Sequence, residues 1–272
     1  MRLSGLVLVL ALGAAARAEQ LTDAVPGHPG ITYGDLMKQV IPDLEPQDGG
    51  RWSGTDIPAL AGPDGNPDQN DLSGGFVFSS VDVLKVREAG KSRILLLTGG
   101  TETDSFAEIL AAFDDEATVP KLLDLVDIGV DRFTNFGDAP QKLSEADDLF
   151  VLDNSHSNSN QEYLIADLMF LRDGRFRRAA EVMTLSERLC THEMRETSKV
   201  ATKARRGAVY RDVDVAVTQE TTLTDLDCGD ARRPKPGRKV WRDVFRWDPA
   251  KREFVSRTDR LGDLAKDNEK QF

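Results

Sequence analysis

Beyond its first 18 residues the sequence contains no long apolar run. A helix that crosses a bilayer needs about 20 consecutive apolar residues, so we expect a soluble mature chain with no membrane span. The sequence also lacks the C-x-x-C and H-E-x-x-H spacings of zinc sites, a P-loop and a dinucleotide fingerprint. These absences argue against the common zinc-dependent and nucleotide-dependent enzymes.

The first 18 residues have the features of a cleavable signal peptide. Arg2 supplies a positive charge, residues 6–12 (LVLVLAL) form an apolar core too short to span a bilayer, and residues 16–18 (ARA) place small residues at the cleavage site. We therefore predict cleavage after Ala18. The mature chain would begin near Glu19, have 254 residues (272 minus 18), and be periplasmic or secreted.

Cysteine is scarce, and the two that are present predict a disulfide. No cysteine lies near the cleavage site, which excludes a lipid anchor on a new N-terminal cysteine. In an oxidising compartment Cys190 and Cys228 are expected to pair, closing a loop of 38 residues. Such a bridge stabilises a fold by about 3–4 kcal/mol in the chain-entropy description. A free thiol pair, or a metal site with His192 and Asp227, remains the alternative.

The charge is unevenly distributed along the chain. With 30% charged and 40% apolar residues the composition is that of a globular protein, and the net charge of −11 disfavours nucleic acid and anionic lipid as partners. Residues 19–170 carry 28 acidic and nine basic residues, whereas residues 171–272 carry 18 acidic and 24 basic residues. Either the two halves attract each other within one fold, or the basic half binds an anionic partner.

The N-terminal part of the mature chain predicts one short helix followed by irregular structure. Residues 33–41 favour a helix, with Thr32 as the N-cap, Asp35 at its third position and Pro42 at its end. Residues 42–75 are rich in proline and glycine and predict a long irregular segment.

From residue 76 onward, short apolar segments alternate with turn residues, which predicts β-strands joined as hairpins. Asp173-Gly174 is the strongest turn signal, and Asp248-Pro249-Ala250-Lys251 is typical of a type I turn. The alternation of Val213, Val215 and Val217 with polar residues predicts one buried face. The expected strands are residues 81–86, 93–97, 149–152, 163–171, 175–185, 213–217, 241–247 and 251–255. Residues 106–113 and 121–128 are also interpreted as strands, although Ser105 and Glu108 resemble a capping box, which leaves a helix as the alternative there.

The sequence therefore predicts a mainly β protein, an antiparallel meander arranged as a sandwich or open barrel, with a short N-terminal helix. We expect a signal peptide at 1–18, a helix and loop segment at 19–75, and a single β domain at 76–272.

The most unusual segment is residues 153–161 (DNSHSNSNQ), in which every residue is polar. We interpret it as a loop between two strands that could present a ligand with oxygen and nitrogen groups. Asn and Ser also stabilise turns without any ligand, and that interpretation is favoured. The candidate binding residues are Asp153, Asn154, His156, Asn158 and Asn160.

An exported hydrolase is the alternative function, with His156 as general base or metal ligand and Asp153 orienting it. Ser155 precedes His156, but neighbouring side chains of an extended chain point to opposite faces. No G-x-S-x-G elbow surrounds any serine. We therefore assign no catalytic residue.

A calcium-stabilised module is a further alternative. Asp64, Asn66 and Asp68 stand at alternate positions, as at the start of a calcium loop, and would be the metal ligands. The EF-hand pattern then fails, because Gln69 occupies the glycine position and Gly75 the bidentate glutamate position. A solvated turn is favoured, and no cofactor is expected unless calcium binds here.

Two features of the C-terminal half also suggest binding. Residues 232–239 (RRPKPGRK) form a basic, proline-rich link that could contact an anion such as an acidic cell-wall polymer. Trp241, Phe245 and Trp247 share one strand face and could stack on sugar rings, although aromatic residues at this spacing more often fill a core. The expected function is a non-catalytic binding or envelope-associated protein with an unidentified ligand or envelope component as partner and an undetermined oligomeric state.

Overall fold

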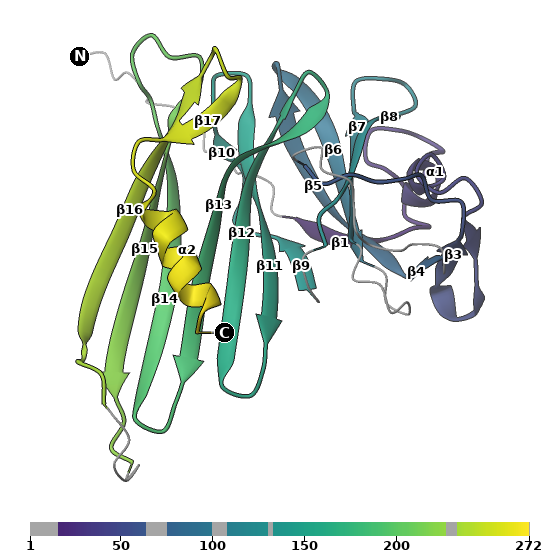
Figure 1. Ribbon diagram of the computed structural model, residues 1–272. Coiled ribbons are helices and arrows are strands. Elements are labelled where there is room, and N and C mark those ends of the chain that lie inside the picture. The colour runs from purple at the N-terminus through teal and green to yellow at the C-terminus, as the bar shows by residue number, and fades with distance from the viewer. Residues whose placement is uncertain (1–15, 64–74, 100–107, 130–132, 227–232, 272) are drawn as a thin grey trace, which may run out of the picture.

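The computed structural model describes residues 16–63, 75–99, 108–129, 133–226 and 233–271. They form three antiparallel sheets and two short helices (Figure 1), so the predicted mainly β fold with a short N-terminal helix is confirmed. Each of the two larger sheets ends in edge strands within this described part, and neither closes on itself.

The first sheet has five strands in the order β1-β5-β6-β7-β8. They are β1 (Arg17–Gln20), β5 (Ser80–Glu88), β6 (Lys91–Gly99), β7 (Glu108–Asp114) and β8 (Lys121–Asp127). The strands expected at residues 81–86 and 93–97 are confirmed and form a hairpin, because β5 and β6 pair across a two-residue turn in which Ala89 and Gly90 have positive φ. β1 pairs with the edge of β5, and cleavage after Ala18 would leave only the second half of β1.

One face of this sheet is covered by the N-terminal segment. The helix α1 (Tyr33–Met37) is shorter than predicted, but its capping box is present: Asp35 N donates to Thr32 Oγ1 at 3.2 Å and Thr32 N donates to Asp35 Oδ2 at 2.8 Å. Leu36, Met37 and Ile41 are fully buried against the sheet. The apolar face of this short element therefore closes the first core.

The segment predicted as irregular contains a small sheet of its own. It includes β2 (Glu45–Pro46), the 3-10 turn η1 (Asp48–Gly50) and β3 (Trp52–Gly54), and β3 pairs with β4 (Phe76–Phe78). Asp43 orders the exit from β3, because its carboxylate accepts from the backbone N–H groups of Thr55 and Asp56 at 2.9 Å each. Those hydrogen bonds hold the pKa of Asp43 below its usual value.

The second sheet has nine strands, with the order β10 to β17 following the chain and β9 pairing with β11. The strands are β9 (Phe133–Phe136), β10 (Gln141–Lys142), β11 (Asp148–Ser157), β12 (Gln161–Arg172), β13 (Arg175–Arg188), β14 (His192–Lys203), β15 (Asp212–Leu223), β16 (Gly237–Asp248) and β17 (Glu253–Ser256). The Asp173-Gly174 hairpin is confirmed, and Val213, Val215 and Val217 are fully buried.

The second sheet opens between β13 and β14. Only Ser186–Arg188 pair with Glu193–Arg195, although both strands continue far beyond this point. The C-terminal helix α2 (Arg260–Glu269) contacts β13 and β16, and its Leu261 and Leu264 join the second core. The buried leucine face of α2 thus covers the sheet where β13 and β14 separate (Figure 1).

A buried glutamate satisfies polar groups at this opening. The Glu196 carboxylate accepts from Leu185 N at 3.0 Å, from Gln219 Nε2 at 3.0 Å and from Asn268 Nδ2 of α2 at 2.7 Å. Burial raises the pKa of Glu196. The Glu196 carboxylate therefore accepts the hydrogen bond that the backbone N–H of Leu185 would otherwise donate to a neighbouring strand.

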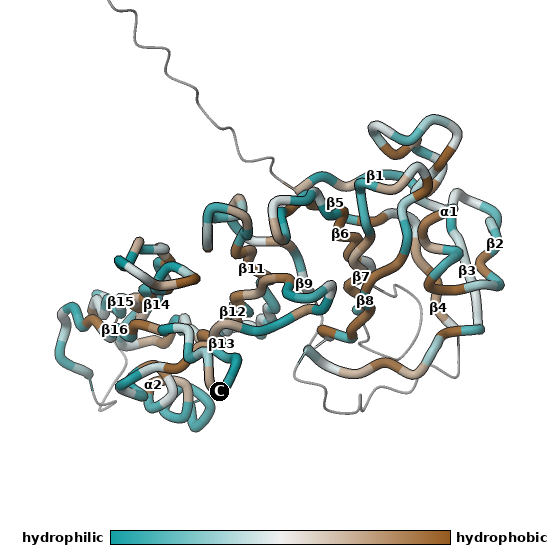
Figure 2. The backbone as a smooth tube through the Cα atoms, turned by 90° about the horizontal axis from the view of Figure 1, so that it is seen from above, coloured by the Kyte–Doolittle hydropathy of each residue, from teal (hydrophilic) through white to brown (hydrophobic). Residues whose placement is uncertain are grey.

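The two larger sheets pack together through a third core, as in a sandwich. Leu84, Leu97 and Leu110 of the first sheet meet Phe150 and Met169 of the second, and all are nearly inaccessible. Seen from above in Figure 2, hydrophobic residues lie along β6 and β7 of the first sheet, and the strands β9 and β11 lie beside that sheet.

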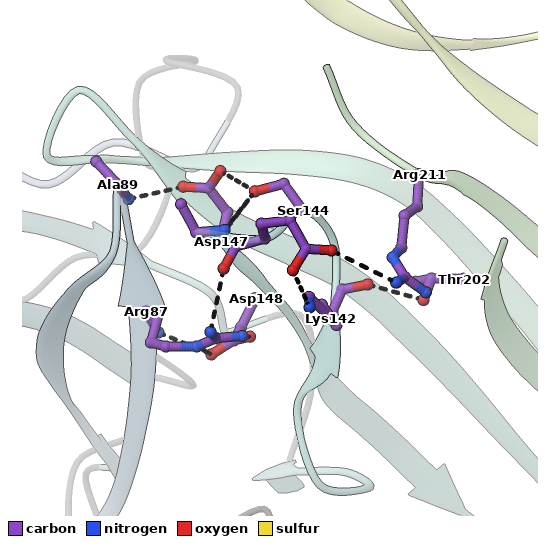
Figure 3. Close-up of polar contacts among 10 residues, drawn as sticks. Arg87, Ala89, Lys142, Ser144, Asp147, Asp148, Thr202 and Arg211 are labelled. Carbon is purple, nitrogen blue, oxygen red and sulfur yellow. Dashed lines mark hydrogen bonds and ion pairs between the residues drawn. The ribbon is translucent and has the colours of Figure 1, made fainter. Parts of the chain in front are cut away.

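Polar contacts tie the rim of this third core together (Figure 3). Arg87 pairs with Asp148, Ala89 N donates to Asp147 Oδ1 at 2.8 Å, and Ser144 Oγ donates to Asp147 Oδ2 at 2.5 Å. The turn before β11 is thereby fixed to the β5–β6 hairpin. This connection sets the position of the second sheet on the first.

Candidate functional site

The polar segment 153–161 is not a loop for most of its length. β11 continues to Ser157, and only residues 158–160 form the turn into β12. The expectation of a long loop was wrong because β11 pairs with β9 on one side and β12 on the other. β9 pairs with Leu152 to Ser155 and β12 pairs through Ser157, so the backbone finds partners and the polar side chains do not end the strand.

The five predicted binding residues do not form one site. Asn154 is fully buried and accepts from Thr134 Oγ1 at 2.5 Å, while the His156 ring stacks on Tyr163 at 5.8 Å between centroids. Burial, and next the charge of Asp138, raise the pKa of the partly buried Asp153. Asn158 and Asn160 alone lie in the turn, where Asn158 Oδ1 accepts from Asn160 N at 3.0 Å. That is the turn-stabilising role favoured from the sequence.

The arrangement required for the hydrolase alternative is not assembled on β11. Residues 153 and 155 lie on one face of the strand and residue 156 on the other, because side chains alternate along extended backbone. His156 therefore has neither Asp153 nor Ser155 beside it on its own face. The structure brings no nucleophile and base together in this segment.

The two binding segments singled out in the sequence do approach each other at one end of the second sheet. A hollow of about 350 Å³ lies between residues 157–162 and the β13–β14 hairpin. A second hollow of about 620 Å³ lies between that hairpin, residues 234–239 and Gln271. Both are lined by Glu187 and Met194, which are cross-strand partners. We call the two hollows together the distal cleft. The β11–β12 and β13–β14 hairpin turns that line it lie at the same end of the second sheet (Figure 1).

The lining of the distal cleft is polar and more basic than acidic. Five cations and three carboxylates surround it, together with the amides and hydroxyls of the hairpin turns. The cations are Arg188, Arg195, Lys235, Arg238 and Lys239, and the carboxylates are Glu162, Glu187 and Glu193. Such a surface offers hydrogen-bond donors and positive charge to an anionic, hydroxylated ligand.

A hydrogen-bonded chain of three side chains forms one wall of the cleft. His192 Nε2 lies 3.0 Å from Glu187 Oε1, and His192 Nδ1 lies 2.9 Å from Thr191 Oγ1. Gln161 Nε2 donates to Gln271 O at 2.9 Å and so joins the start of β12 to the end of the chain. Thr191 is only 5% exposed. The Thr191 hydroxyl is covered. The three hydrogen-bonded side chains therefore hold the wall rigid and present no nucleophile.

The aromatic strand face belongs to the core, as the sequence favoured. Trp247 is 8% exposed and packs against Phe170 and Phe254 at 6.2 and 5.5 Å between ring centroids. Trp241 and Phe245 are partly buried against the same cluster. These rings are therefore not a flat surface for stacking sugars.

Several predicted residues lie outside the described residues. They are Asp64, Asn66, Asp68, Asp227, Cys228 and Arg232. The calcium site and the disulfide of Cys190 with Cys228 therefore stay predictions. Among the residues whose positions are described, no group of three His, Cys, Asp or Glu side chains could hold a metal ion, and no helix is long and apolar enough to cross a bilayer.

No sequence pattern predicts that the β13–β14 hairpin forms the centre of the cleft. β14 (HEMRETSKVATK) has few apolar residues and no clear alternation, so it was not expected as a strand. From the sequence, His192 is a candidate only for the alternative metal site. The polar segment 153–161 and the basic segment 232–239 stand out in composition, whereas this hairpin does not.

Comparison with known proteins identifies no relative: no protein-family model, no curated protein and no solved structure matches the chain.

Proposed function

We propose that this chain is an exported, non-catalytic binding protein that holds an anionic, hydroxyl-rich polymer of the cell envelope in the distal cleft. The convergence of residues 157–162 and 234–239 on the β13–β14 hairpin carries this proposal. Segments far apart in the sequence supply hydrogen-bonding groups and cations to one surface. Loops on a rigid β scaffold are a common way to build such a site.

Charge supports an anionic ligand. The protein as a whole is acidic, yet the cleft lining has five cations for three carboxylates. Lys235 and Lys239 are exposed, and Arg238 lies 3.7 Å from an exposed Glu220, a contact that solvent weakens. These cations are available to a ligand. A polymer fits better than a small molecule because the two hollows adjoin along the end of the sheet.

The contacts of His192 in the described part of the chain support binding without catalysis. Thr191 is the hydroxyl that contacts this imidazole, and it is covered. Glu187 and His192 are held by each other at 3.0 Å, so both serve the wall of the cleft.

Binding of polygalacturonate, a carboxylated polysaccharide, tests the proposal against neutral dextran of similar length. We expect polygalacturonate to bind and dextran not to bind, with affinity falling as salt is added. Combined substitution of Lys235, Arg238 and Lys239 by Gln is expected to weaken binding at least tenfold.

The matched control removes three exposed cations elsewhere, with Lys91, Lys121 and Arg206 replaced by Gln. It has the same net charge as the cleft variant, and we expect less than a threefold loss of affinity. An equal loss in both variants would show attraction by net charge alone and would reject the cleft as the site. Equal binding of dextran would reject the anionic ligand.

Export is tested separately by sequencing the N-terminus of the protein recovered from the cell envelope or medium. We expect it to begin near Glu19. A protein that keeps Met1 or residue 2 at its N-terminus and remains in the cytoplasm would contradict the signal peptide.

A further inference from the structure

A second hollow lies away from the distal cleft, among β12, β13, β16 and β17. Its volume is about 580 Å³, within the range of small-molecule sites. We call it the bulge pocket. Its apolar lining is formed by Phe170, Ala179, Ala180, Phe245, Trp247 and Phe254.

A β-bulge creates this pocket. Leu168 pairs with Ala180 and Met169 pairs with Arg178, so Ala179 has no partner on β12. Ala179 and Ala180 are consecutive and both buried, which a regular strand with one solvated face would not allow. Because the two side chains at the bulge are methyl groups, space remains above the neighbouring rings.

The rings around the pocket are locked in place. Phe170, Trp247 and Phe254 pack edge to face, with centroids 5.5 to 6.2 Å apart. The Arg172 guanidinium lies 4.4 Å from the centroid of the Trp247 ring. The apolar wall is therefore rigid and exists before any ligand binds.

The rim of the pocket is basic, and its cations differ in their pairing. Lys251 lies 3.6 Å from Glu253, and Arg252 lies 2.6 Å from Asp173. Arg178 lies 2.7 Å from Asp167 and 3.2 Å from Glu181.

Arg177 is the exception on this rim, because it makes no ion pair within the part of the chain that the structure describes. It is exposed and lies opposite Phe170, so both side chains are on the same face of the sheet. An unpaired guanidinium next to an apolar wall is suited to a ligand with one anionic group and a hydrocarbon or aromatic body.

We infer that the bulge pocket binds a small amphiphilic carboxylate, with the carboxylate on Arg177 and the apolar body against Ala179, Ala180 and the aromatic wall. A carboxylate matches the two-pronged guanidinium, and the body removes apolar wall area from water. This site is separate from the distal cleft and is independent of the polymer-binding proposal.

Decanoate, used below its micellar concentration, is the probe, and decanol is the neutral ligand with the same chain. Calorimetric titration is expected to show decanoate binding at least tenfold more tightly than decanol. Arg177→Gln is expected to remove that difference, and Arg206→Gln, which removes an exposed cation elsewhere, is expected to leave it unchanged.

A second variant tests the apolar part of the pocket. Ala180→Leu fills the space at the bulge and is expected to abolish binding of both ligands, with near-UV circular dichroism confirming that the variant is folded. If it does not fold, the Arg177 variant alone decides. No decanoate binding, equal binding of decanol, or an unchanged decanoate affinity in Arg177→Gln would each overturn the inference.

Discussion

Arg87 of β5 and Asp148 of β11 form a two-point ion pair between the two sheets (Figure 3). Arg87 Nη2 lies 2.6 Å from Asp148 Oδ1 and Arg87 Nε lies 3.1 Å from Asp148 Oδ2, which also accepts from Arg87 N at 2.9 Å. The Asp148 side chain is only 13% exposed, whereas that of Arg87 is 43% exposed. One carboxylate thus satisfies the backbone and the side chain of a strand in the other sheet.

Arg87→Gln is expected to lower the free energy of unfolding by about 1 kcal/mol. The expected loss is small because solvent around the partly exposed arginine screens the ion pair. Urea denaturation measures this loss. Arg238→Gln is the control, because its partner Glu220 is 3.7 Å away and both side chains are about two-thirds exposed. The control should change stability by less than about 0.5 kcal/mol. Equal effects in the two variants would contradict a special role for the inter-sheet pair.

Glu108 is expected to make the protein less stable as pH rises. Burial raises the pKa of Glu108 to about 7, with Asp127 and Asp82 adding to the effect and a hydrogen bond from Thr134 N at 3.1 Å opposing it. The contribution of this group is fully present below pH 4.5 and is lost as pH rises through about 7. The difference is on the order of 3 kcal/mol.

Glu108→Gln keeps an acceptor for Thr134 N and removes the titration. Urea denaturation at several pH values from 4.5 to 8 should therefore show a smaller loss of stability with rising pH than in the unmodified protein. Glu269→Gln, an exposed carboxyl on α2, should leave the pH dependence as it is. A profile of Glu108→Gln identical to that of the unmodified protein would contradict the assignment.

Asp214 is expected to act in the opposite direction, at acidic pH. Its hydrogen bonds from Arg242, and then Lys203, lower the pKa of Asp214 to about 2. The stability that this carboxylate contributes is present above its ordinary pKa of 3.8 and is lost as pH falls through about 2. Asp214→Asn should flatten the acid limb of the unfolding profile, whereas Asp263→Asn, an exposed carboxyl of α2, should not.

The pairing of Cys190 with Cys228 is expected to survive purification without reductant. Thr224 N donates to Thr191 O at 3.1 Å, and Thr224 Oγ1 donates to Cys190 O, so a residue shortly before Cys228 in the chain lies beside Cys190. Intact mass should be two hydrogens below that of the reduced chain. Reduction should lower stability by about 3–4 kcal/mol. Two thiols titratable in the denatured, unreduced protein would contradict the bridge.

Local signals predicted many elements correctly. The hydroxyl of Thr32 and the carboxylate of Asp35 are three residues apart, so their capping box needs no distant partner. The prediction of the Asp173-Gly174 turn was also correct because its signal is local. Both residues adopt positive φ in the structure, and Asp and Gly accept it more readily than most residues. The alternation of valines with polar residues over 213–217 correctly predicted a buried strand face.

Other features depended on contacts that the sequence does not show. β11 extends through polar residues because β9 pairs with it, and Asn154 is buried because Thr134 binds its side-chain oxygen. β14 is a strand because β15 pairs along its whole length, although its own residues are mostly polar. Neither partner could be assigned before the strand order was known.

The candidate site likewise has features that the sequence predicts and features that only the tertiary structure determines. The sequence alone identified two polar or basic segments by their composition, and with them the mainly β class and several turns. Tertiary structure alone decided that residues 157–162 and 234–239 flank one hairpin, that Asp153 and His156 point to opposite faces, and that a bulge at Ala179 opens a pocket. Turns and periodicities follow from interactions between residues close in the chain, whereas the shape of a cleft follows from pairing and burial between distant strands, which only the packed fold determines.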